Sequence, residues 1–167
     1  MSLLLQRKSI RQYTDQPIPN DIIDELLKAA MQAPSAVNQQ PWEFIVVDNA
    51  SLLEQLSQTS RGAWMLKDVS KAIVVVMKET DKSPVMAPQD CAAATQNILL
   101  RATELSLGAV WIGVFPKEER FTHVDEVLHI KKGHAFSMIA LGYPEKEASV
   151  TLRYDPKRVH YNTYGEE

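Results

Sequence analysis

The sequence lacks the residues on which several kinds of redox and nucleotide-binding chemistry depend. Cys91 is its only cysteine, and the 167 residues include only six glycines. One thiol cannot form an internal disulfide or act as half of a thiol pair that shuttles electrons. Neither of two glycine-rich nucleotide-binding patterns, GxGxxG and GxxxxGKS/T, follows a predicted strand. Redox chemistry would therefore need a bound cofactor, held by side chains rather than by a phosphate loop.

Long hydrophobic runs and an excess of basic residues are missing as well. The longest apolar run, 72–77, is far shorter than the roughly 20 residues of a membrane-spanning helix. The formal charge of -3 argues against a general affinity for nucleic acid, which needs a broad basic face. The first charges follow the leucines at 3–5 instead of preceding them, so we expect no export signal. These absences predict a cytoplasmic protein with no membrane and no nucleic-acid partner.

Metal-binding spacings are absent too. The four histidines are scattered, and they match neither HExxH nor a pairing with CxxC. We therefore expect no metal site, and surface or hydrogen-bonded core histidines at His123, His129, His134 and His160.

What the sequence does contain is typical of one globular domain. Hydrophobic residues make up 45% of the chain and charged residues 23%, which are ordinary values for a folded protein. A length of 167 residues lies near the middle of the usual range for a compact unit. We therefore expect residues 1–167 to form a single domain.

The spacing of apolar residues indicates alternating helices and strands. It predicts an amphipathic helix over Asn20–Ala33, capped by Asn20 or Asp21. Lys71–Lys78 is a continuous apolar run between lysines, which favours an interior strand covered on both faces. The other predicted elements are strands at Trp42–Asp48, Ala109–Phe115 and Ala135–Pro144, a helix with a capping box of Ser51 and Glu54 that reaches about Thr59, a long helix over about Asp90–Ser106 that Gly108 stops, and a short helix over Lys117–Leu128.

The order of these elements predicts an α+β fold. Helices alternate with strands along the chain, and an interior strand needs helices above and below it. We therefore expect a sandwich of helices packed on a central sheet, with parallel crossovers between its strands.

Cations are concentrated near the N-terminus. Arg7, Lys8 and Arg11 occur within RKSIRQY, together with the hydroxyl group of Ser9. The planar donors of arginine suit a phosphate group, and serine adds a neutral donor. A compact bound anion is one interpretation of this cluster, and an ordinary solvated helix end is the other.

Four segments, taken together, resemble the nitroreductase family of flavin enzymes. They are RKSIRQY, APSAVNQQPWEFIVV, LGAVWIGVF and YDPKRVHY, and they occur in this order. The most specific are the Arg-x-Ser-x-Arg start and Pro-Ser-x-x-Asn-x-Gln-Pro-Trp, and the resemblance covers nearly the whole chain. It implies an α+β three-layer sandwich, with a central mixed sheet flanked by helices, in an intertwined homodimer that binds FMN at the subunit interface.

The resemblance also implies a set of FMN-binding residues. Arg7, Lys8 and Ser9 resemble ligands of the phosphate and the ribityl chain, and Arg11 resembles a cation beside the pyrimidine end of the flavin. Such a cation would stabilise the reduced flavin and raise its reduction potential. The other implied cofactor-binding residues are Pro34, Ser35, Ala36, Asn38 and Gln40 in a loop that approaches from the other subunit, Ile112 and Gly113 near flavin N5, and the C-terminal cations Lys157 and Arg158.

Plainer interpretations of these positions are also consistent with the sequence. The loop could be an ordinary helix exit, Ile112 part of a generic core strand, and the C-terminal tail a frayed end. The tail, however, carries Tyr154, Val159, Tyr161 and Tyr164, which would expose apolar surface in water. In the family such a tail extends across the partner subunit, so a large interface is expected.

The implied function is that of an NAD(P)H-dependent oxidoreductase with a ping-pong hydride mechanism. NADH or NADPH would reduce the flavin, and a small planar acceptor such as a nitroaromatic, a quinone or a free flavin would then take the electrons. The cofactor performs the bond chemistry, so we predict no catalytic side chain. Two alternatives stay open: an FMN-binding store or sensor without turnover, and a specialised flavin enzyme of the dehalogenase or flavin-destructase type, which typically needs added lid or loop segments that the sequence does not show.

Overall fold

A four-stranded sheet forms the centre of the molecule. The computed structural model describes residues 2–146 and 149–165, and the sheet has the order β1-β2-β4-β3. Its strands are β1 (Trp42–Val47), β2 (Lys71–Met77), β3 (Gly108–Gly113) and β4 (His134–Gly142). The helices are α1 (Leu3–Gln6), α2 (Asn20–Met31), α3 (Ala50–Ser57), α4 (Ala87–Glu104) and α5 (Glu118–Leu128), with short 3-10 helices η1 (Ala36–Asn38), η2 (Arg61–Asp68), η3 (Pro84–Met86) and η4 (Pro156–Arg158).

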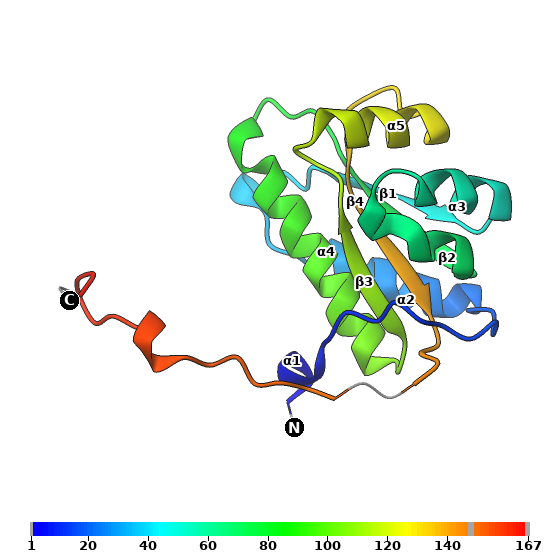
Figure 1. The fold of residues 1–167 in the computed structure, drawn as a ribbon. Helices are drawn as coiled ribbons and strands as arrows, with labels where there is room; N and C mark the ends of the chain where they lie inside the picture. Colours follow the sequence, from blue (N-terminus) through cyan, green and yellow to red (C-terminus); the bar gives the residue numbers. More distant parts are fainter. Residues whose placement is uncertain (1, 147–148, 166–167) are drawn as a thin grey trace.

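Helices cover both faces of this sheet, as Figure 1 shows. Residues of α2 and α4 share a hydrophobic cluster with Ile73 and Val75 of β2. Residues of α3, η2 and α5 share a second cluster with Ala72 and Val74. This alternation follows the two-residue period of a strand, and it gives the sheet a core on each side. The expected three-layer α+β sandwich is confirmed, and β2 is one of its two interior strands.

The expected parallel crossover occurs once, from β2 through α4 to β3, but neighbouring strands of the sheet are antiparallel. All three ladders, β1 with β2, β2 with β4 and β4 with β3, are antiparallel. The strands β2 and β3, which α4 connects, do run in the same direction, but β4 lies between them. In the part of the chain that the structure describes, parallel pairing occurs only at the isolated bridge between Ser9 and Ala109. The strands β2 and β3 are parallel without being neighbours because β4, the last strand in the chain, inserts between them and pairs antiparallel with both.

The predicted cap of α2 is wrong. The helix begins after Pro19, and no side chain caps it. Asn20 instead accepts a hydrogen bond from Lys71 Nζ at 3.0 Å. That lysine is only 8% exposed, so its charge needs this oxygen and the carboxylate of Asp48, 3.2 Å away. The Asn20 side chain, which the local sequence predicts as a helix cap, therefore bonds to a distant residue instead.

The predicted capping box of α3 is also misplaced. The helix begins at Ala50, and Asn49 caps it, because its side chain accepts a hydrogen bond from Leu52 N at 3.1 Å. Ser51 and Glu54 therefore lie inside the helix. Asparagine is as good a cap as serine, so composition alone does not separate the two registers.

Gly108 does not stop α4, contrary to the prediction. The helix ends with Leu105 as its cap, and Gly108 opens β3. A Cβ atom on Gly108 would lie 2.7 Å from Ile10 Cγ2, and one on Gly142 would lie 2.7 Å from Tyr13 Cδ1. These two glycines thus let the N-terminal segment cross the sheet closely where β3 begins and β4 ends.

The C-terminal tail, residues 154–165, extends away from the sheet and helices in Figure 1. Tyr154, Tyr161 and Tyr164 are 80%, 83% and 87% exposed. The rings of His160 and Tyr164 are in tilted contact, with centroids 4.4 Å apart, so at least this contact lies within the tail itself. One chain alone therefore leaves these rings in water.

Among the residues that the structure describes, none of the helices combines the length and the hydrophobicity that a membrane-spanning helix requires.

Candidate functional site

The predicted phosphate ligands lie on a segment that the sheet holds in place. After α1 the chain becomes extended, and Ile10 N donates a hydrogen bond to Ala109 O of β3 at 3.0 Å. This bond fixes the backbone beside the predicted ligands. Two of these side chains are half-buried, Arg7 and Lys8, and two are exposed, Ser9 and Arg11.

Cations from both ends of the chain line one cavity. Arg7 and Lys8 border a cavity of about 310 Å³, which is also lined by Arg153, Ser149 and Thr151. Guanidinium and ammonium groups together with two hydroxyl groups form a donor set that suits a phosphate. The structure thus brings a C-terminal arginine to the N-terminal cluster.

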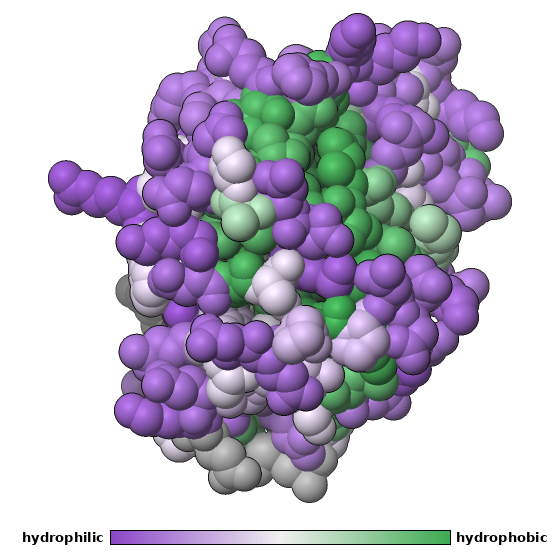
Figure 2. Space-filling view, turned by 90° about the vertical axis from the view of Figure 1, so that its right-hand side faces the viewer, coloured by the Kyte–Doolittle hydropathy of each residue, from purple (hydrophilic) through white to green (hydrophobic). Residues whose placement is uncertain are grey.

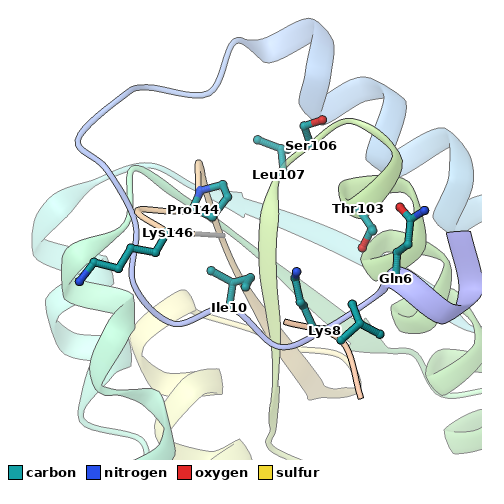
Figure 3. A pocket seen from close by; sticks show the side chains of 9 residues that line it. Gln6, Lys8, Ile10, Thr103, Ser106, Leu107, Pro144 and Lys146 are labelled. Atoms are coloured by element: carbon teal, nitrogen blue, oxygen red, sulfur yellow. The ribbon is translucent and has the colours of Figure 1, made fainter. Parts of the chain in front are cut away.

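A second cavity, of about 420 Å³, adjoins the first through Lys8 (Figure 3). It is also lined by Ile10, Leu107 and Thr103, which lies near the C-terminal end of α4. In Figure 3 the Lys8 side chain extends from the N-terminal segment toward these residues, whereas the nitrogen of Lys146 points away from them. The N-terminal cations therefore sit at the C-terminal end of α4.

Arg11 lies close to a phenol that stays protonated. Burial raises the pKa of the Tyr13 phenol, and the positive charge of Arg11 opposes that shift only in part. The phenol donates a hydrogen bond to Ile10 O, which ties the two ends of this turn together. Tyr13 therefore acts as a neutral anchor for the backbone that carries Arg11.

The loop at 34–41, which precedes β1, has an unusual backbone. Val37, Asn38 and Gln40 have φ angles of 49°, 52° and 48°, in the left-handed region. For a residue other than glycine this region costs about 1–2 kcal/mol, and it is rarest for β-branched residues such as valine. Such strain is found most often at sites where function fixes the backbone. The left-handed backbone therefore gives the exposed side chains of Asn38 and Gln40 a direction that a loop with ordinary φ angles would not give them.

Hydrogen bonds to the buried carboxylate of Asp90 and to the half-buried hydroxyl of Ser35 hold this loop. Asp90, in the first turn of α4, accepts hydrogen bonds from Ala36 N at 3.0 Å and from Gln39 Nε2 at 2.6 Å. Gln40 N donates to Ser35 Oγ at 3.0 Å. A net contribution of about 1 kcal/mol for each bond, and more for those to the carboxylate, offsets much of the strain in the left-handed residues.

The thiol next to this carboxylate is inert. Cys91 donates a hydrogen bond to Pro41 O, with Sγ and the oxygen 3.6 Å apart. Burial, with a smaller effect from the charge of Asp90, raises the pKa of Cys91 to about 12. The thiolate is therefore essentially absent at neutral pH, and Cys91 serves packing rather than chemistry.

The end of β3 offers open backbone. Ile112 is 4% exposed and packs in the core between the sheet, α3 and α5, so its side chain serves the fold. Gly113 is exposed, and a Cβ atom placed there would meet nothing within 4 Å. A flat molecule can therefore approach this backbone closely.

The structure does not bring Lys157 and Arg158 to the other candidates. Both side chains are exposed on the tail, and Arg158 Nε lies 3.4 Å from Asp155 Oδ2 of the same short helix. Arg153 is the C-terminal cation that lines a cavity with Arg7. The roles expected for Lys157 and Arg158 stay predictions.

One chain separates the candidate residues into distant groups. Thr103, beside the N-terminal cations, and Asp90, beside the loop, lie 13 positions apart on α4, which is roughly 20 Å at 1.5 Å per residue. The loop leads into β1, whereas Gly113 ends β3, and three strand spacings between these edges amount to roughly 14 Å. One chain therefore keeps the loop roughly 20 Å away from the N-terminal cations.

Sequence reasoning missed three residues of this region. Gln39 lies between two predicted ligands, and nothing local shows that it faces inward while its neighbours face outward. Asp90 left a signal, since a carboxylate beside an alanine-rich helix face needs a partner. Arg153 left none, because its position relative to Arg7 depends on the path of the whole chain.

The layered fold and the cation-lined cavity define an α+β protein with a site suited to an anionic ligand. A model described as the nitroreductase family matches residues 4–79 and 65–143. The chain therefore belongs to the nitroreductase family, and the resemblance seen in its motifs is confirmed.

Relatives match over nearly the full length. A curated protein of Archaeoglobus fulgidus, provisionally named NADH dehydrogenase/NAD(P)H nitroreductase, is 43% identical over 166 residues, with 96% of this chain and 95% of the relative covered. The structure of an FMN-dependent nitroreductase from Clostridium difficile is similar with a TM-score of 0.90 at 32% identity, covering 97% of this chain and 98% of that one. A provisionally named nitroreductase from Desulfovibrio desulfuricans, solved in complex with FMN, has a TM-score of 0.81 at 27% identity, covering 98% of this chain and 96% of that one.

Proposed function

We propose that this nitroreductase-family member is an FMN-dependent oxidoreductase that takes hydride from NADH or NADPH and reduces small, planar, electron-poor acceptors. The observation that carries the proposal is the convergence of Arg7, Lys8 and Arg153 on one cavity. Relatives named for NAD(P)H and for FMN support the choice of cofactor and electron donor.

The residues present fit both ends of FMN. The cavity of about 310 Å³ offers cations and hydroxyl groups for a phosphate. Gly113, at the far end of β3, offers open backbone for a flat ring. FMN is an elongated molecule with a phosphate at one end and a ring system at the other, so it is the kind of ligand that can contact both.

The separation of the loop and the cations supports a homodimer with FMN at the subunit boundary. A second chain can supply the loop that one chain keeps roughly 20 Å away from its own cations. The tail adds a reason to pair, because Tyr154, Tyr161 and Tyr164 are almost fully exposed in one chain. Figure 2 also shows hydrophobic side chains gathered between polar margins on the side of the molecule where α3 lies. Exposed apolar surface of this kind marks an interface.

Within this proposal the chain binds and orients rather than exchanging protons. Bound FMN supplies the capacity to accept hydride and to pass electrons on. Arg11 would place a positive charge at the pyrimidine edge of bound FMN, which would favour the more negative reduced state. The amides of Asn38 and Gln40 can bond to ring or ribityl oxygens. The open space at Gly113 lets flat reactants stack in turn, so proximity provides the rate enhancement.

Anaerobic titration of the purified yellow protein with NADH or NADPH tests the proposed function. The flavin absorbance should bleach with one or both nucleotides, and it should return when a quinone or a nitroaromatic compound is added. A protein that fails to take up FMN contradicts the proposal. A protein that binds FMN but keeps its colour with both nucleotides is a store or sensor instead.

The two N-terminal arginines are expected to have different roles. Arg7→Ala should weaken FMN binding roughly 10- to 100-fold, since it removes charge-assisted hydrogen bonds to the phosphate. Arg11→Ala should lower the flavin reduction potential by roughly 30 mV or more, the equivalent of about 1.4 kcal/mol for a two-electron couple, with a smaller loss of affinity. Fluorescence titration and equilibration with a redox dye measure the two quantities. If the two substitutions change FMN affinity and the reduction potential equally, Arg7 and Arg11 do not have these different roles.

A further inference from the structure

A single side-chain amide joins the loop at 34–41 to the segment before α4. Gln39 Nε2 donates to Asp90 Oδ2 at 2.6 Å and to Ser83 O at 2.9 Å. Gln39 Oε1 accepts from Thr80 Oγ1 at 3.0 Å and from Ser83 N at 3.1 Å. Both donor and both acceptor positions of the amide are thus used, so the group has one orientation and no spare bond. Fully satisfied polar networks of this kind make a structure rigid.

Asp90 is the buried end of this network. It is 5% exposed, and its two oxygens take different partners, Ala36 N and Gln39 Nε2. Its position in the first turn of α4 places the carboxylate at the positive end of the helix dipole. The loop is therefore fastened to α4 at two points, one on its backbone and one on its central side chain.

The side chains on either side of Gln39 face solvent instead of this network. The side-chain amides of Asn38 and Gln40 are exposed, and both residues have left-handed φ angles. Fastening Gln39 inward is what leaves these two amides facing outward. Without the bonds to Asp90 the loop would relax toward ordinary backbone angles and lose this arrangement.

We propose that Asp90 and Gln39 are positioning residues that fix the loop at 34–41 in its strained shape, so that it can present Asn38 and Gln40 to the FMN bound by a second chain. This inference rests on the proposed function. Neither residue touches the flavin. Their effect reaches the cofactor only through the loop, and it should therefore appear in FMN affinity and in loop protection rather than in the chemistry alone.

Asp90→Asn is the sharpest test because it changes the shape of the side chain very little. The asparagine can accept from Ala36 N or from Gln39 Nε2, but its amide nitrogen then faces the other donor. We expect the dissociation constant for FMN to rise at least about tenfold in the stripped protein. Hydrogen exchange in the peptide at 34–41 should also accelerate at least about tenfold, while the sheet keeps its protection.

Thr95→Val supplies the matched control on the same helix. Thr95 is buried and shares a hydrogen bond of 2.9 Å with Ser137 Oγ, so its loss lowers stability without touching the loop. This variant should lower the melting temperature and leave both FMN affinity and loop exchange unchanged. Gln39→Met, which keeps the bond from Ala36 N to Asp90, is the second variant, and it should reproduce the effects of Asp90→Asn even if the latter folds poorly.

The possible outcomes separate the two proposals. If the wild-type protein takes up no FMN, the proposed function fails and this inference fails with it. If the wild-type protein binds FMN and both Asp90→Asn and Gln39→Met bind it equally well, only the positioning role is overturned. The positioning role is also overturned if Thr95→Val weakens FMN binding as much as they do, because the effect then reflects a general loss of stability.

Discussion

Ending the chain after Arg153 is expected to convert the proposed yellow dimer into a colourless monomer that still folds. The hydrogen bonds of Lys157 N to Asp155 and of Gly165 N to His160 are local to the tail, so the removed residues lend little to their own sheet. The cation cavity keeps Arg7, Lys8 and Arg153. What the truncated chain loses is the means to hold a second chain, and with it the loop that completes the proposed FMN site. It also loses the predicted FMN-binding cations Lys157 and Arg158.

The size of this effect follows from the exposed rings. A buried tyrosine removes about 150 Å² or more from water, which at about 25 cal/mol per Å² corresponds to roughly 4 kcal/mol before the cost of ordering the tail. Burying three such rings against a second chain leaves a substantial net favourable free energy of dimerisation for each tail. The rings are those of Tyr154, Tyr161 and Tyr164. Sedimentation velocity and the absorbance of bound flavin measure the result.

Replacing the same three tyrosines with phenylalanine provides the control. The rings and their apolar area remain, and only the hydroxyl groups are lost, so this variant should stay dimeric and yellow. A truncated chain that remains dimeric and binds FMN as tightly as the wild type would show that the tail is not what pairs the chains.

Local patterns in the sequence predict most of the elements but not how they pair. The β2 run at 71–77 is apolar at nearly every position, and that signal survives any arrangement of its neighbours. The antiparallel pairing depends on β4, which is the last strand in the chain and lies between β2 and β3. No local pattern shows where a later strand will insert. The predicted cap of α2 failed for a related reason, since Asn20 bonds to Lys71, which lies 51 positions further along the chain.

The candidate site also has residues that local patterns predict and residues that they do not. The N-terminal cations could be predicted because Arg7, Lys8 and Arg11 lie within a few residues of one another. Gln39 and Asp90 could not, because the amide and the carboxylate meet across 51 positions and only the fold brings them together. Asn38 and Gln40 look like Gln39 in the sequence. Their different orientation comes from the left-handed backbone, which a string of amides does not reveal.

Mixed dimers should show whether each FMN site draws its cations and its loop from different chains. One variant is Arg7→Ala, and the other, a loop variant, is Asn38→Ala with Gln40→Ala. In a homodimer of either variant both sites are defective. In a heterodimer of the two, a site shared between chains takes its cations from one variant and its loop from the other. One of the two sites then carries every substitution, and the other is wild type.

We therefore expect such heterodimers, isolated through two different affinity tags, to bind one FMN with wild-type affinity. Placing all three substitutions on one chain and pairing it with a wild-type chain gives the reciprocal control. Shared sites then each lack one half, so no tight site should remain, although the dimer contains the same substitutions. If each site were built from a single chain, the two results would be exchanged: no tight site in the first heterodimer and one in the second. Flavin stoichiometry by titration distinguishes these outcomes, because only the distribution of the substitutions between the chains differs.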